Sequence, residues 1–126
     1  MKKSYLFLLL ILCFGCKKNS SDPTPVTPAA KPTMHIVISS TKLFSYNITE
    51  VDPATSDFST KDDYDVTSLD YTFTPAPGHT VTIEAIGLAT ATVTATATYN
   101  SKDIGPFTQF KDDVHNTLSL TYAVPK

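Results

Sequence analysis

The feature that most constrains this chain is an alternation of apolar and polar residues that recurs throughout residues 33–126. A period of two places successive side chains on opposite faces of a β-strand, whereas an amphipathic helix needs a period near 3.6. In the longest run, residues 91–99, four threonines share one face, and the other face carries Val93, Ala95, Ala97 and Tyr99. β-Branched threonine packs well on a solvent-facing pleated surface, so this run predicts a strand with one solvent-exposed face and one buried face.

Five further runs alternate in the same way, and their apolar faces predict the core. The expected inward-facing residues are Met34, Ile36, Ile38, Phe44, Tyr46, Ile48, Leu69, Tyr71, Phe73, Val81, Ile83, Ala85, Leu118, Leu120, Tyr122 and Val124. Turn-forming residues separate the runs: residues 75–78 (Pro-Ala-Pro-Gly), Gly87, a tight hairpin at Asn100 and Ser101, and a break at Gly105-Pro106.

About seven short strands with short connections favour two packed antiparallel sheets. Residues 33–126 span 94 positions, which is close to the size of an immunoglobulin-like sandwich. The sequence therefore predicts an all-β fold, an immunoglobulin-like antiparallel β-sandwich of about seven strands, in one domain.

Residues 1–15 are predicted to be an export signal. Lys2 and Lys3 precede a ten-residue apolar run, residues 5–14, which is too short to cross a bilayer, since a spanning helix needs about 20 residues. Gly15 and Cys16 follow, and this ending resembles the lipobox of bacterial lipoproteins, in which a small residue precedes an invariant cysteine. The resemblance implies cleavage after residue 15 and lipidation of Cys16; an uncleaved N-terminal anchor helix is the alternative.

Residues 16–32 are expected to be the lipidated cysteine and a flexible linker, because four prolines punctuate polar and small residues there. An extended chain of about 3.1 Å per residue would reach roughly 50 Å. Lys17, rather than aspartate, follows the cysteine, and by resemblance to lipoprotein sorting in diderm bacteria this favours the outer membrane. The expected partners are thus the membrane, through the lipid on Cys16, and an envelope protein.

Charge and cysteine content exclude several classes of function. Residues 1–15 hold two lysines and no acidic residue, so the remaining chain has 8 lysines, 12 acidic residues and a net charge of −4. The chain contains no arginine, the preferred side chain for phosphates and base edges, so nucleic acid is not expected as a partner. Beyond Cys16 there is no cysteine, which excludes an internal disulfide and cysteine-ligated metals.

The order of elements in residues 33–126 also resembles a family. The pattern is two strands, an acidic loop, the strand around Leu69, a Pro-Ala-Pro-Gly-His turn, the Ala/Thr strand and a final Leu-Ser-Leu-Thr-Tyr strand. It resembles small lipoproteins of Bacteroidota-type bacteria with one immunoglobulin-like domain, and more loosely the MmpS-like β-sandwich, whose members assist lipid-exporting pumps. The resemblance is one of pattern, and no functional residue is carried over.

Acidic residues and histidines are the candidate site residues. Asp62, Asp63 and Asp65 lie in an expected acidic loop, and Asp112 and Asp113 form a second acidic pair. If both loops met at one end of the sandwich, their carboxylates could bind Ca²⁺, but the spacing does not match an EF-hand, and solvated loops are the simpler interpretation. His35 is expected on an outward face and His79 and His115 in turns, without the spacing of a metal site.

No catalytic motif is present, since no G-x-S-x-G elbow occurs. Glycan binding usually uses aromatic platforms, but the chain has no tryptophan and only Tyr64 is expected to be free. We therefore expect no metal, no cofactor and no enzyme activity. The favoured interpretation is a lipid-anchored, non-enzymatic interaction or structural module; a glycan- or lipid-binding module and a small hydrolase are the alternatives. The sequence leaves the oligomeric state open.

Overall fold

A computed structural model describes residues 30–126, and the structural statements below concern this part of the chain. The predicted signal peptide (residues 1–15), the predicted lipidation site Cys16 and most of the predicted linker lie outside the described residues. Within residues 30–126, no helix is long and apolar enough to cross a membrane. The elements are seven strands: β1 (Met34–Val51), β2 (Phe58–Phe73), β3 (Thr80–Leu88), β4 (Val93–Tyr99), β5 (Lys102–Asp103), β6 (Thr108–Lys111) and β7 (His115–Ala123).

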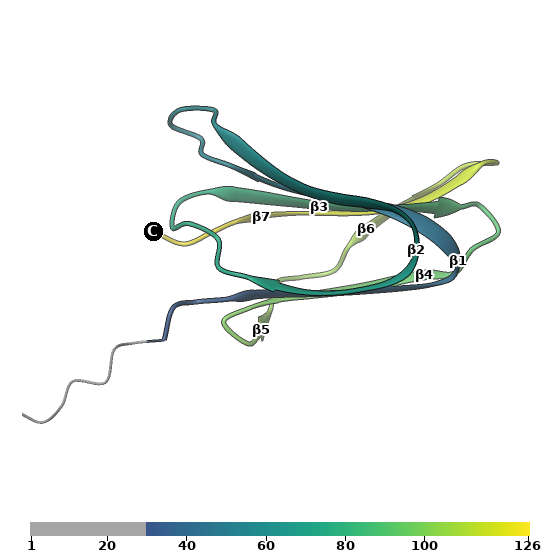
Figure 1. The fold of residues 1–126 in the computed structure, drawn as a ribbon, viewed down its shortest axis with the longest axis horizontal. Helices are drawn as coiled ribbons and strands as arrows, with labels where there is room; N and C mark the ends of the chain where they lie inside the picture. The colour runs from purple at the N-terminus through teal and green to yellow at the C-terminus, as the bar shows by residue number, and fades with distance from the viewer. Residues whose placement is uncertain (1–29) are drawn as a thin grey trace, which may run out of the picture.

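β1 and β2 form one long antiparallel hairpin that is bent in its middle (Figure 1). Ser39 pairs with Ser68 and Phe44 with Val66, so the four residues 40–43 of β1 lie opposite the single residue Thr67. This excess of residues in one strand makes the hairpin turn a corner, as irregular pairing does in other curled sheets. Both ends of β1 consequently lie at the same end of the molecule.

The bend gives β1 two successive neighbours on its other side. Its first half pairs with β4, which continues to β5, and its second half pairs with β3, which continues to β7 and β6. The single sheet thus curls into two facing layers, and Tyr99 of β4 meets Tyr122 of β7 across the interior with ring centroids 5.5 Å apart. The predicted class, an all-β antiparallel sandwich of about seven strands, is confirmed, with one curled sheet in place of two separate sheets.

The apolar faces predicted from the alternation form the core. All the expected inward-facing residues are buried or pack against the buried cluster, and Met34, Ile36, Ile38, Val81 and Ile83 are completely enclosed. On β4 the alternation is reproduced, because Val93 and Ala97 are buried while Thr94 and Thr96 are exposed. Burial of these side chains therefore drives the two layers together, at about 25 cal/mol for each Å² of apolar surface removed from water.

Two of the predicted turns have the backbone geometry that their residues favour. Asn100 and Ser101, with φ of 50° and 62°, make the two-residue hairpin between β4 and β5, which is the left-handed pattern of a type I′ turn. In residues 76–79 the N–H of His79 donates to the carbonyl of Ala76, and Gly78 has a φ of 82°, as a type II turn requires at its third position.

Three expectations were wrong. The two strands expected before the acidic loop are one strand, because β1 continues through the corner that the extra residues make. The expected acidic loop is instead the first half of β2: its side chains are almost all exposed on an edge strand, so it lacks an apolar alternation. Gly87 does not end its strand either, since it pairs with both Phe44 and Asn116 inside β3, and a Cβ there would lie 3.0 Å from Val93 Cγ2.

Candidate functional site

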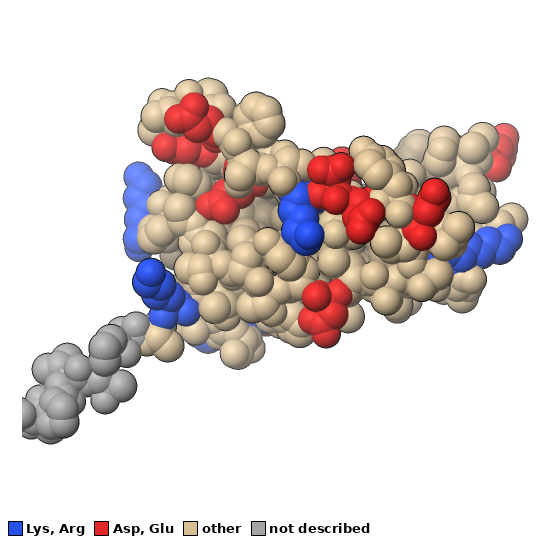
Figure 2. Space-filling view, viewed as in Figure 1, with Lys and Arg blue, Asp and Glu red and all other residues tan. Residues whose placement is uncertain are grey.

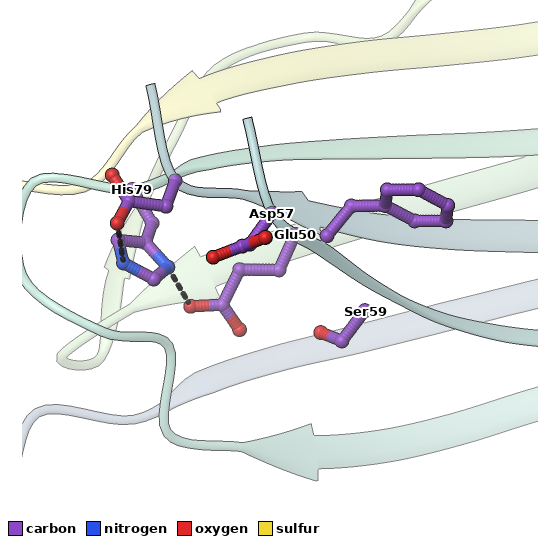
Figure 3. Close-up of a pocket in the computed structure, with 6 residues that line it drawn as sticks. Glu50, Asp57, Ser59 and His79 are labelled. Atoms are coloured by element: carbon purple, nitrogen blue, oxygen red, sulfur yellow. Dashed lines mark ion pairs between the residues drawn. The ribbon is translucent and has the colours of Figure 1, made fainter. Parts of the chain in front are cut away.

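A cluster of ionisable side chains lies at the end of the sandwich where the described chain begins, which we call the proximal end. His79 bridges two carboxylates of the β1–β2 hairpin: its Nδ1 lies 2.9 Å from Glu50 Oε1 and its Nε2 lies 3.9 Å from Asp52 Oδ2 (Figure 3). The N–H of Ala76 also donates to Glu50 Oε1, at 2.7 Å. These contacts join the hairpin to the 76–79 turn.

The local backbone accounts for the positions of these groups. Proline and glycine favour the turn that places His79 directly before the start of β3. The turn after β1 closes with a hydrogen bond from the N–H of Asp52 to the carbonyl of Asp57. The N–H of Ala54 donates to Asp52 Oδ1 at 2.8 Å, which is the main cause that lowers the pKa of this carboxyl. His79 contributes a smaller electrostatic lowering of the same pKa.

The cluster borders a recess of about 350 Å³, lined by Glu50, Asp52, Asp57, Phe58, Ser59 and His79. Both contacts of Glu50 use Oε1, and within residues 30–126 no hydrogen bond uses Oε2, so this oxygen can accept from a hydroxyl or ammonium group. Nucleophilic catalysis by serine needs a hydrogen-bonded base. Ser59 makes no such bond to His79 in the described chain, and Figure 3 shows Glu50 between them.

A second, more apolar recess of about 470 Å³ adjoins Glu50 on the side where the described chain begins. Its lining residues include Pro75, Pro77, Tyr99, Lys31 and Pro32. Glu50 therefore lines both recesses, the polar one beside His79 and the more apolar one beside the prolines. The contacts shown for Glu50 and His79 connect segments that are distant in sequence, and their evident effect is to tie these segments together.

A third hollow, of about 330 Å³, lies at the opposite end, which we call the distal end and which contains the corner of β1 and the turn between β6 and β7. Its lining includes Leu43, Ile86 and Leu88 together with Asp65 and His115. Asp65 belongs to a bulge, because Tyr64 and Asp65 together lie opposite Ser45, and its φ of 57° is left-handed. This hollow combines exposed aliphatic side chains with a carboxylate at its rim.

The five acidic residues singled out in the sequence occupy two elements. Asp62, Asp63 and Asp65 lie in β2 and not in a loop, whereas Asp112 and Asp113 lie in the turn before β7. Figure 2 shows acidic side chains spread over the face in view and not gathered at one point. Asp65 and Asp112 both lie at the distal end: Asp65 lines the hollow together with His115, and Asp112 Oδ1 is 3.9 Å from His115 Nδ1.

Across residues 30–126, no group of three or more histidine, cysteine or acidic residues is arranged to hold a metal ion. Calcium requires six to eight oxygen ligands, so the described residues do not form the convergent site considered from the sequence. The Asp112 carboxylate instead accepts from the N–H groups of His115 and Val114, at 2.6 and 2.7 Å, and these bonds lower its pKa.

The histidines and Tyr64 occupy simpler environments. His35 is half-exposed on β1 and its Nε2 lies 2.8 Å from Asp70 Oδ1. His115 starts β7, so it lies at the end of a strand and not in the turn that was expected. Tyr64 is exposed, as expected from the sequence. The sequence analysis missed Glu50, because one glutamate near the end of an alternating run carries no motif.

Comparisons with known proteins found no match for this chain among protein-family models, curated proteins or solved structures.

Proposed function

We propose that this protein is a lipid-anchored, non-enzymatic interaction module of a bacterial cell envelope, held in the outer membrane by acyl chains on Cys16. The support for the anchor is the sequence of residues 1–16, with its two lysines, short apolar run and Gly15-Cys16 ending. Each buried CH₂ adds about 0.8 kcal/mol of membrane affinity, so two or more acyl chains hold a protein far more firmly than one.

The observation that carries the interaction role is that a group of exposed apolar side chains lies at the distal end, whereas Phe58, which is also exposed, lies at the proximal end. Leu43 and Leu88 are at the distal end, beside the corner of β1, while Lys31 lies at the proximal end against residues 75–77. A chain that is attached at its N-terminus would therefore present this apolar surface away from the point of attachment. Exposed apolar patches on small domains mark sites of interaction, and the proline-rich linker adds reach.

The decisive test of the anchor compares the full-length protein with a Cys16→Ser variant in membrane fractions of the native bacterium. The unaltered protein should stay in the outer-membrane fraction after high-salt washing, and the variant should be lost from it. A Cys13→Ser variant is the matched control, because Cys13 would leave with the signal peptide and its replacement should not change retention.

Mass spectrometry of the mature N-terminal peptide gives an independent measurement. We expect Cys16 to be the first residue and to carry a diacylglycerol thioether. A free Cys16 thiol in the purified protein, or equal membrane retention of the Cys16→Ser variant, would contradict the proposal.

A further inference from the structure

We infer that the distal end binds a polypeptide segment of a partner protein, and that this segment carries apolar side chains together with a lysine or arginine. The inference rests on the proposed function for its envelope setting and specifies the partner's chemistry. We call the binding surface the distal patch and define it by Leu43, Ile86, Leu88 and Phe110.

Strand register places members of the distal patch on one outward face. Phe110 pairs with Thr117, Thr117 with Ile86, and Ile86 with Ser45, so Phe110 and Ile86 lie in one row across four strands. Leu88 is two residues further along β3, in the next outward position. The exposed fractions are 52% for Leu43, 42% for Ile86, 53% for Leu88 and 65% for Phe110.

This surface is hollowed as well as apolar. The hollow of about 330 Å³ is lined by three members of the patch, Leu43, Ile86 and Leu88, and its floor includes the backbone of Gly87 and the buried Phe44. A side chain inserted there would contact aliphatic groups on several sides. Small domains rarely leave a contiguous apolar hollow of this kind open to water unless it binds something.

The charges around the hollow select a cationic partner. Asp65 lines the hollow, Asp112 lies beside His115 at its rim, and no lysine is among the lining residues. Two lysines adjoin members of the patch in sequence. Lys42 directs its Nζ to Thr90 Oγ1 at 2.6 Å, and Lys111 follows Phe110 on β6 and therefore lies on the opposite face of that strand. If an apolar side chain of the partner enters the hollow, a basic side chain beside it in the partner would meet the Asp65 carboxylate. Complementary charges of this kind steer association and set specificity.

The same charges argue against two other occupants. In a symmetric dimer the same patch meets itself, which would bring the Asp65 and Asp112 carboxylates of both copies close together. An anionic lipid surface would likewise be repelled by these carboxylates, because both are negative and like charges repel within about 10 Å at moderate salt. A basic polypeptide segment satisfies both the apolar and the acidic parts of the surface.

Site-specific photo-crosslinking in the full-length protein tests this inference. Leu88 is replaced by the photoreactive residue benzoyl-phenylalanine and the protein is irradiated in intact cells of the native bacterium. Thr96, exposed on the outer face of β4, takes the same residue as the control. We expect a defined protein adduct from position 88 and none from position 96, and mass spectrometry of the adduct should find lysine or arginine within a few residues of the crosslinked position.

A charge reversal in the same experiment tests the role of Asp65. We expect Asp65→Lys to lower the yield of the adduct about fivefold, which corresponds to about 1 kcal/mol of lost interaction. Asp70→Lys is the matched control, because it makes the same change on the same strand, in the half of β2 that pairs with the first half of β1. Circular dichroism of the purified variants checks that each keeps its β-sheet content.

Four results would overturn the inference: no adduct at position 88, an adduct with the mass of two copies of this chain, adducts with lipid only, or a yield that Asp65→Lys leaves unchanged. The anchor is judged separately, by the Cys16→Ser fractionation. A firmly anchored protein with no adduct contradicts the inference alone, whereas an adduct from a protein without acyl chains contradicts the anchor alone.

Discussion

At the scale of single residues, two carboxyl groups within residues 30–126 have a lowered pKa, and the main cause is hydrogen bonding from backbone N–H groups. Asp52 accepts from Ala54, and Asp112 accepts from both Val114 and His115. Each bond satisfies an amide in a turn or, for His115, at the first residue of the strand that follows the turn. The charged form of the carboxylate is the better acceptor, so the fold stabilises it and the pKa falls.

The lowered pKa of Asp112 predicts a pH-dependent stability. A folded-state pKa below the unfolded value contributes stability above about pH 4, and this contribution is lost as the pH falls through the folded-state value. Asp112→Asn should therefore unfold at a lower temperature than the unaltered protein at pH 7, and the difference should shrink between pH 4 and about pH 2.

Thermal unfolding followed by circular dichroism at several pH values checks this expectation. Asp113→Asn removes a charge from the same turn and serves as the control. A difference for Asp112→Asn that stays constant from pH 7 to pH 2 would contradict the assigned cause.

Some of these residue-scale features could be predicted from sequence and others could not. The alternation assigned the buried face correctly. Tyr64 is exposed as expected, although the expectation placed it in a loop and it lies in β2. The Glu50–His79 contact could not be predicted, because it depends on how the 76–79 turn meets the end of β1. The partner of a side chain from a distant segment is set by how the strands and turns are arranged in space, and local residue patterns carry no information about that arrangement.

At the scale of elements, β2 is an edge strand, and its charged residues and irregular pairing protect it against pairing with another chain. β2 pairs only with β1 in the described chain, which leaves its other edge without a strand. It carries Lys61 and four aspartates, and the bulge at Tyr64 and Asp65 interrupts its regular pairing. Charged residues and bulges discourage another chain from adding to an open edge. This role explains why its first half looks like a loop in sequence.

The β4–β5 turn gives a prediction at this scale. Asn100 has a φ of 50°, a conformation that asparagine and glycine tolerate and β-branched residues do not. Asn100→Val should lower the free energy of unfolding by about 1–3 kcal/mol. Asn100→Gly, which adopts this φ freely, should leave stability within about 0.5 kcal/mol of the unaltered value.

Urea unfolding of the two Asn100 variants measures the difference. Equal stability of Asn100→Val and Asn100→Gly would show that the type I′ geometry of this turn does not limit stability.

At the scale of the whole molecule, β1 joins the two layers. Its first half belongs to the layer of β4, and its second half to the layer of β3, β7 and β6. The buried residues of both layers, Ile36 and Ile83 among them, form one core cluster. Because the layers share both a strand and a core, we expect the domain to unfold as one cooperative unit.

A core substitution in one layer tests this cooperativity in the other. Ile83→Ala in β3 removes buried methyl groups and should cost about 2–5 kcal/mol of unfolding free energy. Hydrogen exchange of the β4 amides, for example that of Ala97, should lose the same amount of protection. Unchanged protection in β4 would show instead that the two layers open independently.

The sequence by itself determined the fold class, the buried face of most strands and the positions of the principal turns. It could do so because alternation, proline and glycine act through local backbone geometry, which neighbouring residues decide. Only the tertiary structure decided that β1 is one bent strand, that Asp62, Asp63 and Asp65 lie on an edge strand, and that Glu50 meets His79. These features depend on which strands become neighbours, and pairing over long sequence separations is settled by the packing of the whole core.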